Sequence, residues 1–247
     1  MTLSPEQIEC YRERGYCIVR HLVPPKLIEA ARNRIAEIAE DRPDWPIKHF
    51  QILDPEKYTG RSGKSIPGGL QRPGLCEEVF ARIAEHENLS TSMACLLDGP
   101  VELFTEQIGI KHGWIEEEQG GRSYYHQDSW YWKIDPELGC NCWIPMDTVG
   151  SDEIALAVMP GSHRDWKLTE HESYYDDPPW GRANPTFEPF KRHRIPSDTI
   201  DYTNEALIPM EAGDGLFFTN YTWHRSEPNR SGQTKAFYAI AYQRAST

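Results

Sequence analysis

The sequence predicts a mainly β fold, as a sandwich, barrel or jelly roll, with a mainly helical N-terminal part. Residues 101–247 hold many short segments rich in β-branched and aromatic residues, separated by Gly, Pro and Asn, which is typical of strands joined by turns. Residues 1–100 have a mainly helical pattern instead. Because 247 residues can bury one sizeable core, we expect a single domain over residues 1–247.

Two helices are expected near the N-terminus. Ser4 can cap the first helix, and Gly15 should end it because glycine readily adopts the left-handed conformation found there. Residues 16–19 are expected to form a short β segment. A second helix should run from Pro24 to about Asp41, because its apolar residues fall on one face at helical spacing.

The next segment, residues 42–75, is rich in proline and glycine and has little periodicity. We therefore expect a long irregular loop there, outside the regular helices and strands. Two short helices should follow, at about 76–86 and 89–97.

Seven strands are expected in the C-terminal part, at 101–112, 122–129, 139–147, 154–160, 206–210, 214–220 and 234–243. The interval 161–205 interrupts this series and is rich in aromatic and basic residues. Loops of this length in compact domains are usually functional or disordered. The aromatic content favours a lid that covers a binding site.

The charge pattern narrows the possible partners. A formal net charge of -12 and a pI near 5.2 argue against binding nucleic acid or an anionic membrane, because phosphate recognition needs clustered Lys and Arg. The first residues carry charges where a signal peptide needs an apolar run, and no apolar stretch approaches about 18 residues. We expect a cytoplasmic protein that acts on a small molecule.

The six cysteines are scattered along the chain, and a chain of this size does not need disulfides to fold. We expect reduced thiols. Cys140 and Cys142 form the only close pair, and no second pair is present to complete a tetrahedral zinc site.

His126 and Asp128 form the most informative short motif. In an extended segment, residues two apart point to the same face, so one metal ion could contact both side chains. A third ligand must come from elsewhere, and His224 is the candidate because it follows a strand within the β region. Two imidazoles and one carboxylate form the arrangement that binds non-haem Fe(II). The alternative is an ordinary polar pair satisfied by hydrogen bonds.

The whole chain resembles the phytanoyl-CoA dioxygenase family of Fe(II)/2-oxoglutarate oxygenases. The matching segments are LSPEQIECYRERGYCIVRHLVPPKLIEAAR, YHQD, MPGSHRDW, GDGLFF and HRSEPNRSGQTKAFYAIAYQ, in family order between Leu3 and about Tyr242. The resemblance implies a double-stranded β-helix with helices packed outside. It also implies His126, Asp128 and His224 as the iron ligands.

The resemblance further implies a binding site for 2-oxoglutarate. The basic residue that holds its distal carboxylate corresponds to Lys235, where most relatives carry Arg. Lysine is a point charge rather than a planar fork, and Arg230 is a competing anchor. Ser226, Gln127 and Trp143 match other positions near the cosubstrate, although Trp143 could equally serve core packing.

The implied reaction consumes O2 and 2-oxoglutarate, releases succinate and CO2, and oxidises an unactivated C–H bond. An intact carboxylate at Asp128 favours hydroxylation, desaturation or ring closure over halogenation. We expect a small metabolite as substrate, in specialised-metabolite biosynthesis, with Tyr124 and Trp130 as candidates for the cavity wall. A cupin-like metal protein or sensor without 2-oxoglutarate turnover, and a non-catalytic β-barrel binding protein, are the alternatives.

Overall fold

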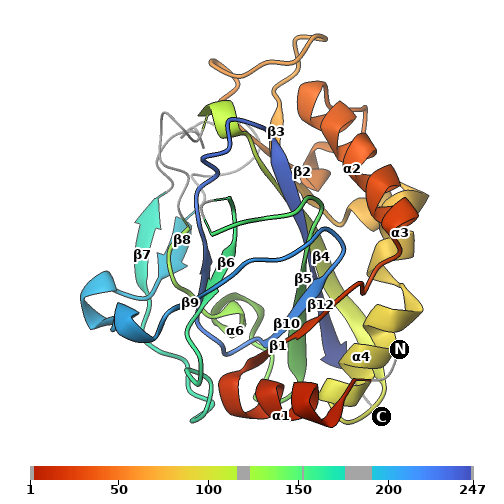
Figure 1. Ribbon diagram of the computed structural model, residues 1–247. Coiled ribbons are helices and arrows are strands. Elements are labelled where there is room, and N and C mark those ends of the chain that lie inside the picture. Colours follow the sequence, from red (N-terminus) through yellow and green to blue (C-terminus); the bar gives the residue numbers. More distant parts are fainter. Residues whose placement is uncertain (1–2, 116–122, 152, 176–190, 246–247) are drawn as a thin grey trace.

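Two antiparallel β-sheets face each other in the computed structural model, which describes residues 3–115, 123–151, 153–175 and 191–245 (Figure 1). Within these residues the larger sheet contains, in spatial order, β1 (Tyr16–Val19), β10 (Gly215–Thr219), β5 (Gly139–Pro145), β12 (Lys235–Arg244), β4 (Val101–Lys111), β3 (Pro67–Gln71) and β2 (Phe50–Ile52). The smaller sheet contains β11 (His224–Ser226), β6 (Leu156–Val158) and β9 (Ala206–Ile208). A separate hairpin pairs β7 (Glu172–Tyr175) with β8 (Lys191–Arg194).

Helices cover the outer face of the larger sheet (Figure 1). The α-helices of the described residues include α1 (Pro5–Arg14), α2 (Pro25–Glu40), α3 (Glu78–Ala84), α4 (Glu87–Leu96) and α6 (Asp128–Trp132). Short 3-10 helices are present at Ile47–His49, Pro73–Leu75, Ser197–Thr199 and Tyr202–Asn204. No helix in the described part of the chain is long and apolar enough to cross a membrane.

Strand β5 shows how one strand serves two cores. Successive side chains point to opposite faces of a sheet. Cys142 and Ile144 therefore pack with the helices in the outer core, whereas Trp143 joins an inner cluster with Leu156 of the smaller sheet. The inner cluster lies between the two sheets. All six cysteines are free, which confirms the expectation of thiols.

The first helix follows its sequence signals closely. Ser4 accepts a hydrogen bond from the Gln7 N–H, and the Gln7 side chain accepts one from the Ser4 N–H, so both ends of the capping box are formed. Gly15 ends the helix with a φ of 84°. A Cβ atom at this position would also lie 2.5 Å from side-chain atoms of His163 and Thr222, so the turn requires glycine for two reasons.

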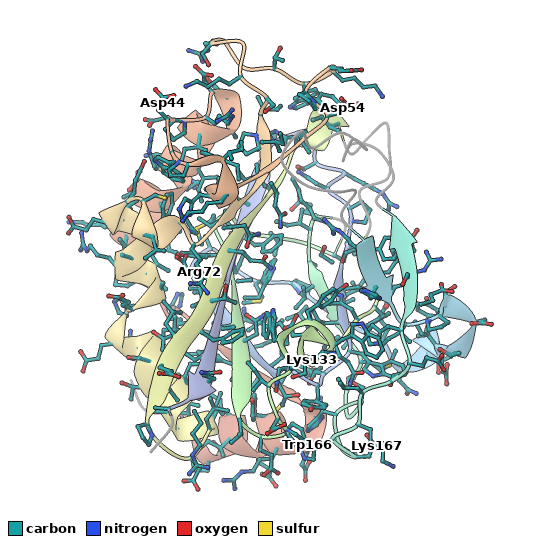
Figure 2. The ribbon with its side chains drawn as sticks, turned by 180° about the vertical axis from the view of Figure 1, so that it is seen from behind. Asp44, Asp54, Arg72, Lys133, Trp166 and Lys167 are labelled. Carbon is teal, nitrogen blue, oxygen red and sulfur yellow. The ribbon has the colours of Figure 1, made fainter. Side chains whose placement is uncertain are left out.

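The prediction of a long irregular loop over residues 42–75 was only partly right, because β2 and β3 lie within this segment and extend the larger sheet. Strand β3 pairs with β4, and Gly69 approaches the backbone of Ile108 closely. The pairing partner is distant in sequence, which local patterns do not reveal. Figure 2 places Asp44 and Asp54 of this segment at one end of the molecule, with Trp166 and Lys167 at the other.

The strand expected over residues 122–129 is also different in the structure. Its extended part contains His126, which forms an isolated β-bridge with His224, and the helix α6 begins at Asp128. The helix ends at Lys133, which has a φ of 58°. Residue 122 lies outside the described residues. Helix α6 therefore turns the chain immediately after the histidine.

Candidate metal centre

His126, Asp128 and His224 come together because of one backbone pairing. The N–H of each histidine donates to the carbonyl oxygen of the other, at 3.1 and 3.2 Å. This pairing joins segments almost a hundred residues apart in the sequence. Asp128 then enters the same space as the first residue of α6.

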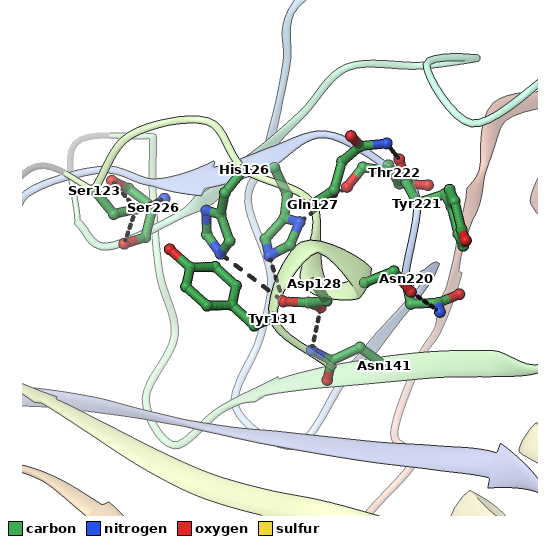
Figure 3. Close-up of polar contacts among 12 residues, drawn as sticks. Ser123, His126, Gln127, Asp128, Tyr131, Asn141, Asn220, Tyr221, Thr222 and Ser226 are labelled. Carbon is green, nitrogen blue, oxygen red and sulfur yellow. Dashed lines mark hydrogen bonds and ion pairs between the residues drawn. The ribbon is translucent and has the colours of Figure 1, made fainter. Parts of the chain in front are cut away.

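The three side chains converge closely enough to share one ion (Figure 3). The Nε2 atoms of His126 and His224 lie 3.8 and 3.6 Å from Oδ1 of Asp128. One potential ligand atom from each residue lies within 4.8 Å of the others. The His126 side chain is 26% exposed and that of His224 only 7%, so the His126 side of the centre is the more accessible.

Hydrogen bonds to backbone carbonyls set the tautomer of both imidazoles. Nδ1 of His126 lies 2.9 Å from the Tyr124 carbonyl oxygen, and Nδ1 of His224 lies 3.0 Å from that of Thr222. A carbonyl oxygen only accepts, so each Nδ1 carries the proton and each Nε2 presents a lone pair. Two nitrogen lone pairs and a carboxylate oxygen thus face one another, and no hydrogen bond to them is present among the described residues. A cation satisfies such a group of acceptors. An ordinary hydrogen-bonded His–Asp pair would need a hydrogen on Nε2, which neither imidazole has.

Burial affects the protonation of all three groups. It lowers the pKa of both His126 and His224 to about 4, so both imidazoles are neutral at neutral pH. Burial also raises the pKa of Asp128, although His126 and a hydrogen bond from Asn141 act in the opposite direction. Nδ2 of Asn141 donates to Oδ2 of Asp128 at 3.0 Å, which leaves Oδ1 to face the imidazoles.

Gln127 points away from the imidazoles (Figure 3). Its side chain supports the segment that carries His126 and Asp128, which we call the metal segment. Its Nε2 donates to the carbonyl oxygens of Lys167 and Tyr221 at 2.9 and 2.8 Å, and its Oε1 accepts from the Thr169 N–H at 2.7 Å. The side chain is fully buried. Both amide donors are therefore occupied by the protein itself.

His171 is a supporting residue that the sequence did not indicate. Its Nε2 accepts from the Gln127 N–H at 3.2 Å, and its ring stacks on Trp130 at 4.4 Å. Trp130, expected in the cavity wall, instead contributes to this support. Tyr131 lies beside the His126 ring, at 6.1 Å between centroids. Trp130 and Tyr131 differ from the expected positions because helix α6 begins at Asp128, and the two-residue alternation of a strand does not continue into a helix.

The position expected to hold the cosubstrate carboxylate is already paired within the protein. Nζ of Lys235 lies 2.9 Å from a carboxylate oxygen of Glu153 and donates to the Thr148 carbonyl oxygen at 3.1 Å. Lys235 is 8% exposed and shares its strand face with Phe237, a neighbour of the inner cluster. The ammonium therefore lies at the edge of the space between the sheets.

The remaining predicted cosubstrate residues have different environments. Ser226 is buried, two residues after His224, with its Oγ 3.0 Å from that of Ser123. Trp143 is 1% exposed and stacks on Phe237, and its indole N–H has no hydrogen-bond partner among the described residues. Arg230 is exposed in the turn that follows β11.

Comparison with known sequences identifies relatives along nearly the whole chain. The family model described as phytanoyl-CoA dioxygenase (PhyH) matches residues 11–237. A methylphosphonate hydroxylase from Gimesia maris is 26% identical, over 98% of this chain and 81% of the relative. A probable phytanoyl-CoA dioxygenase from Caenorhabditis elegans is also 26% identical, over 93% of this chain and 72% of the relative.

Solved structures share the fold. EctD from S. alaskensis, with 2-oxoglutarate and 5-hydroxyectoine, has a TM-score of 0.71 and 14% identity, over 98% of this chain and 76% of that one. EvdO2 from Micromonospora carbonacea var. aurantiaca, complexed with 2-oxoglutarate, has a TM-score of 0.69 and 18% identity, over 99% and 92% of the two chains. These similarities confirm the double-stranded β-helix. Because the family model spans most of its length, the chain belongs to the phytanoyl-CoA dioxygenase (PhyH) family of iron- and 2-oxoglutarate-dependent oxygenases.

Proposed function

We propose that His126, Asp128 and His224 hold Fe(II), and that the enzyme uses 2-oxoglutarate and O2 to oxidise an unactivated C–H bond of a small metabolite, releasing succinate and CO2. One observation carries this proposal. Three hydrogen-bond acceptors converge on one space with fixed orientations, which is the donor set of a non-haem iron site.

The protein residues have definite tasks in this reaction. Fe(II), when bound together with 2-oxoglutarate and O2, supplies the oxidising power that no side chain provides. The carbonyls of Tyr124 and Thr222 keep both Nε2 lone pairs directed at the ion. Asn141 orients the carboxylate of Asp128. Burial of Asp128 and His224 limits the access of water to that side of the centre.

Lys235 is the proposed anchor for the distal carboxylate of 2-oxoglutarate, with Ser226 and Trp143 as further proposed residues of the cosubstrate site. The partnerless indole N–H of Trp143 supports this assignment, because a buried donor without an acceptor is costly. The exposure of Arg230 and the internal hydrogen bonds of the Gln127 amide support lesser roles for these two residues.

Hydroxylation, desaturation or ring closure is the proposed outcome rather than halogenation, because Asp128 retains a carboxylate where halogenation needs a small residue. The similarity to a methylphosphonate hydroxylase and to EctD with 5-hydroxyectoine supports a small, polar substrate. Similarity to an epimerase of nogalamycin biosynthesis supports a place in specialised metabolism.

Anaerobic reconstitution tests the proposed centre. The protein loaded with Fe(II) should develop a weak visible charge-transfer band when 2-oxoglutarate is added, and it should form succinate when O2 is admitted. Asp128→Asn keeps the size of the side chain but removes its charge, so we expect the band and the succinate to fall at least about tenfold. His21→Asn, at an exposed position, is the matched control and should retain both. An Asp128→Asn protein with an unchanged band would contradict the assignment of the ligands.

A further inference from the structure

A polar pocket of about 80 Å³ lies on the inner face of the larger sheet, next to the carboxylate of the metal centre. It is lined by Gln71, Thr105, Gln107, Trp132, Asn141, Ala239 and Ala241. None of these seven lining residues carries a charge. Its size suits one functional group of a substrate rather than a whole metabolite.

The strand register explains both the space and its polarity. Ala241 lies between Asn141 of β5 and Thr105 of β4 in one cross-strand row. Ala239 occupies the next row on the same face, beside Gln107, which is itself paired with Gln71 of β3. The two alanines leave room above β12, and amide and hydroxyl groups surround that room.

Asn141 connects the pocket with the metal centre. Its Nδ2 donates to Asp128, whereas its Oδ1 is buried and has no hydrogen-bond partner among the described residues. Figure 3 shows the amide oxygen on the side away from Asp128. Turning the amide over would place its oxygen against a carboxylate oxygen, so the observed orientation is the favourable one. A buried carbonyl oxygen without a donor is costly, and a bound ligand that donates to it removes this cost.

The neighbouring amides add a second polar contact. Nε2 of Gln71 donates to Oε1 of Gln107 at 3.3 Å, so the two side chains form one unit along the wall. An anionic group in this pocket would lose its hydration next to Asp128 without gaining a cation from the lining residues. A neutral group that donates hydrogen bonds would meet acceptors instead.

We propose that this pocket is the substrate subsite, and that it takes an uncharged hydroxyl or amide group whose hydrogen is accepted by Oδ1 of Asn141. The inference rests on the proposed function, since it places the substrate beside the iron ligands. It assigns an uncharged group of the substrate to this pocket, as a polyol, sugar or amide would supply, and excludes an anionic group from the pocket.

Anaerobic calorimetry on the protein loaded with Fe(II) and 2-oxoglutarate tests this assignment. The probes are myo-inositol, N-acetylglucosamine and methylphosphonate. We expect at least one of the two neutral probes to bind and methylphosphonate not to bind. Gln107→Leu should weaken the neutral probe about tenfold, because it removes a hydrogen-bonding group from the wall. Gln243→Leu changes the same residue type on β12 outside the pocket, where the Gln243 amide donates to Glu102, and the affinity should stay within about twofold of that of the unaltered protein.

A second variant distinguishes a loss of binding from a loss of folding. Thr105→Val is nearly isosteric and should also weaken the neutral probe, with an unchanged melting temperature. The proposal is overturned if neither neutral probe binds, if methylphosphonate binds more tightly than both, or if Gln107→Leu leaves binding unchanged. If the Fe(II)-loaded protein binds a neutral probe but forms no succinate from 2-oxoglutarate and O2, the result would count against the catalytic function and leave the pocket assignment intact.

Discussion

Each imidazole of the proposed metal centre owes its orientation to the carbonyl two residues before it in the chain. Tyr124 stands in this relation to His126, and Thr222 to His224. This local hydrogen bond fixes the ring and its tautomer before any metal is present. A second contact, from Asn141 on strand β5 to Asp128, orients the third proposed ligand. The centre thus combines two local constraints with one long-range constraint.

Glu153 should compete with 2-oxoglutarate for Lys235. Glu153→Gln keeps a hydrogen-bond acceptor beside the ammonium but removes the negative charge, so the affinity for 2-oxoglutarate should rise up to about fivefold. Titration of the visible band with 2-oxoglutarate under anaerobic conditions measures this change.

The control for this prediction is Glu37→Gln, which removes the charge of an exposed ion pair on α2 and should leave the affinity unchanged. A weaker affinity in Glu153→Gln would show that Glu153 holds Lys235 in position rather than competing for it.

Among the elements, α6 and the β7–β8 hairpin contact each other beside His126. The interval expected to be a lid, residues 161–205, contains this hairpin, and residues 176–190 lie outside the described residues. The Tyr131 hydroxyl joins the two elements, because it accepts from the His193 N–H and donates to the His193 carbonyl oxygen, both at 2.8 Å. The ring of Tyr131 lies beside His126, so the same side chain contacts both the hairpin and the metal segment.

Tyr131→Phe should loosen the hairpin without removing the metal centre. The loss of two hydrogen bonds should speed amide exchange at His193 and lower the free energy of unfolding by about 1 kcal/mol. The visible band with Fe(II) and 2-oxoglutarate should remain. Hydrogen exchange followed by mass spectrometry measures the first effect.

Tyr202→Phe is the control for this change, because that tyrosine is exposed and lies on a different segment. Equal exchange rates in Tyr131→Phe and the unaltered protein would show that the hydroxyl does not hold the hairpin.

For the whole molecule, buried histidines make stability depend on pH. Burial lowers the folded-state pKa of six histidines, namely His86, His112, His126, His163, His171 and His224. Below about pH 6.5 the unfolded chain binds protons that the folded chain does not, so acid favours unfolding. Asp128 and Glu106 act in the opposite direction at lower pH, because burial raises the pKa of both carboxyls.

The metal-free protein should therefore lose stability between pH 7.5 and 5.5, with a slope of up to about 1.4 kcal/mol per pH unit for each histidine. Urea midpoints at the two pH values measure the loss. His112→Gln should reduce the slope, because it removes one buried titrating group, whereas His21→Asn at the surface should not. Equal midpoints at both pH values would contradict this reading.

The sequence alone predicted much of the framework. Capping by Ser4, the end at Gly15 and the apolar face of α2 depend on residues close together in the chain, so local chemistry specifies them. Family motifs indicated the three proposed ligands, and the structure brings those side chains together. These features were accessible because they depend on short spacings and on residue type.

Only the tertiary structure decided which distant groups meet. It showed β2 and β3 at the edge of the larger sheet, the ion pair between Lys235 and Glu153, and the contact of His171 with the metal segment. The polar pocket beside Asn141 arises in the same way, from the register of β5, β12 and β4. Cross-strand register and loop placement depend on the packing of the whole chain, so no local pattern in the sequence encodes them.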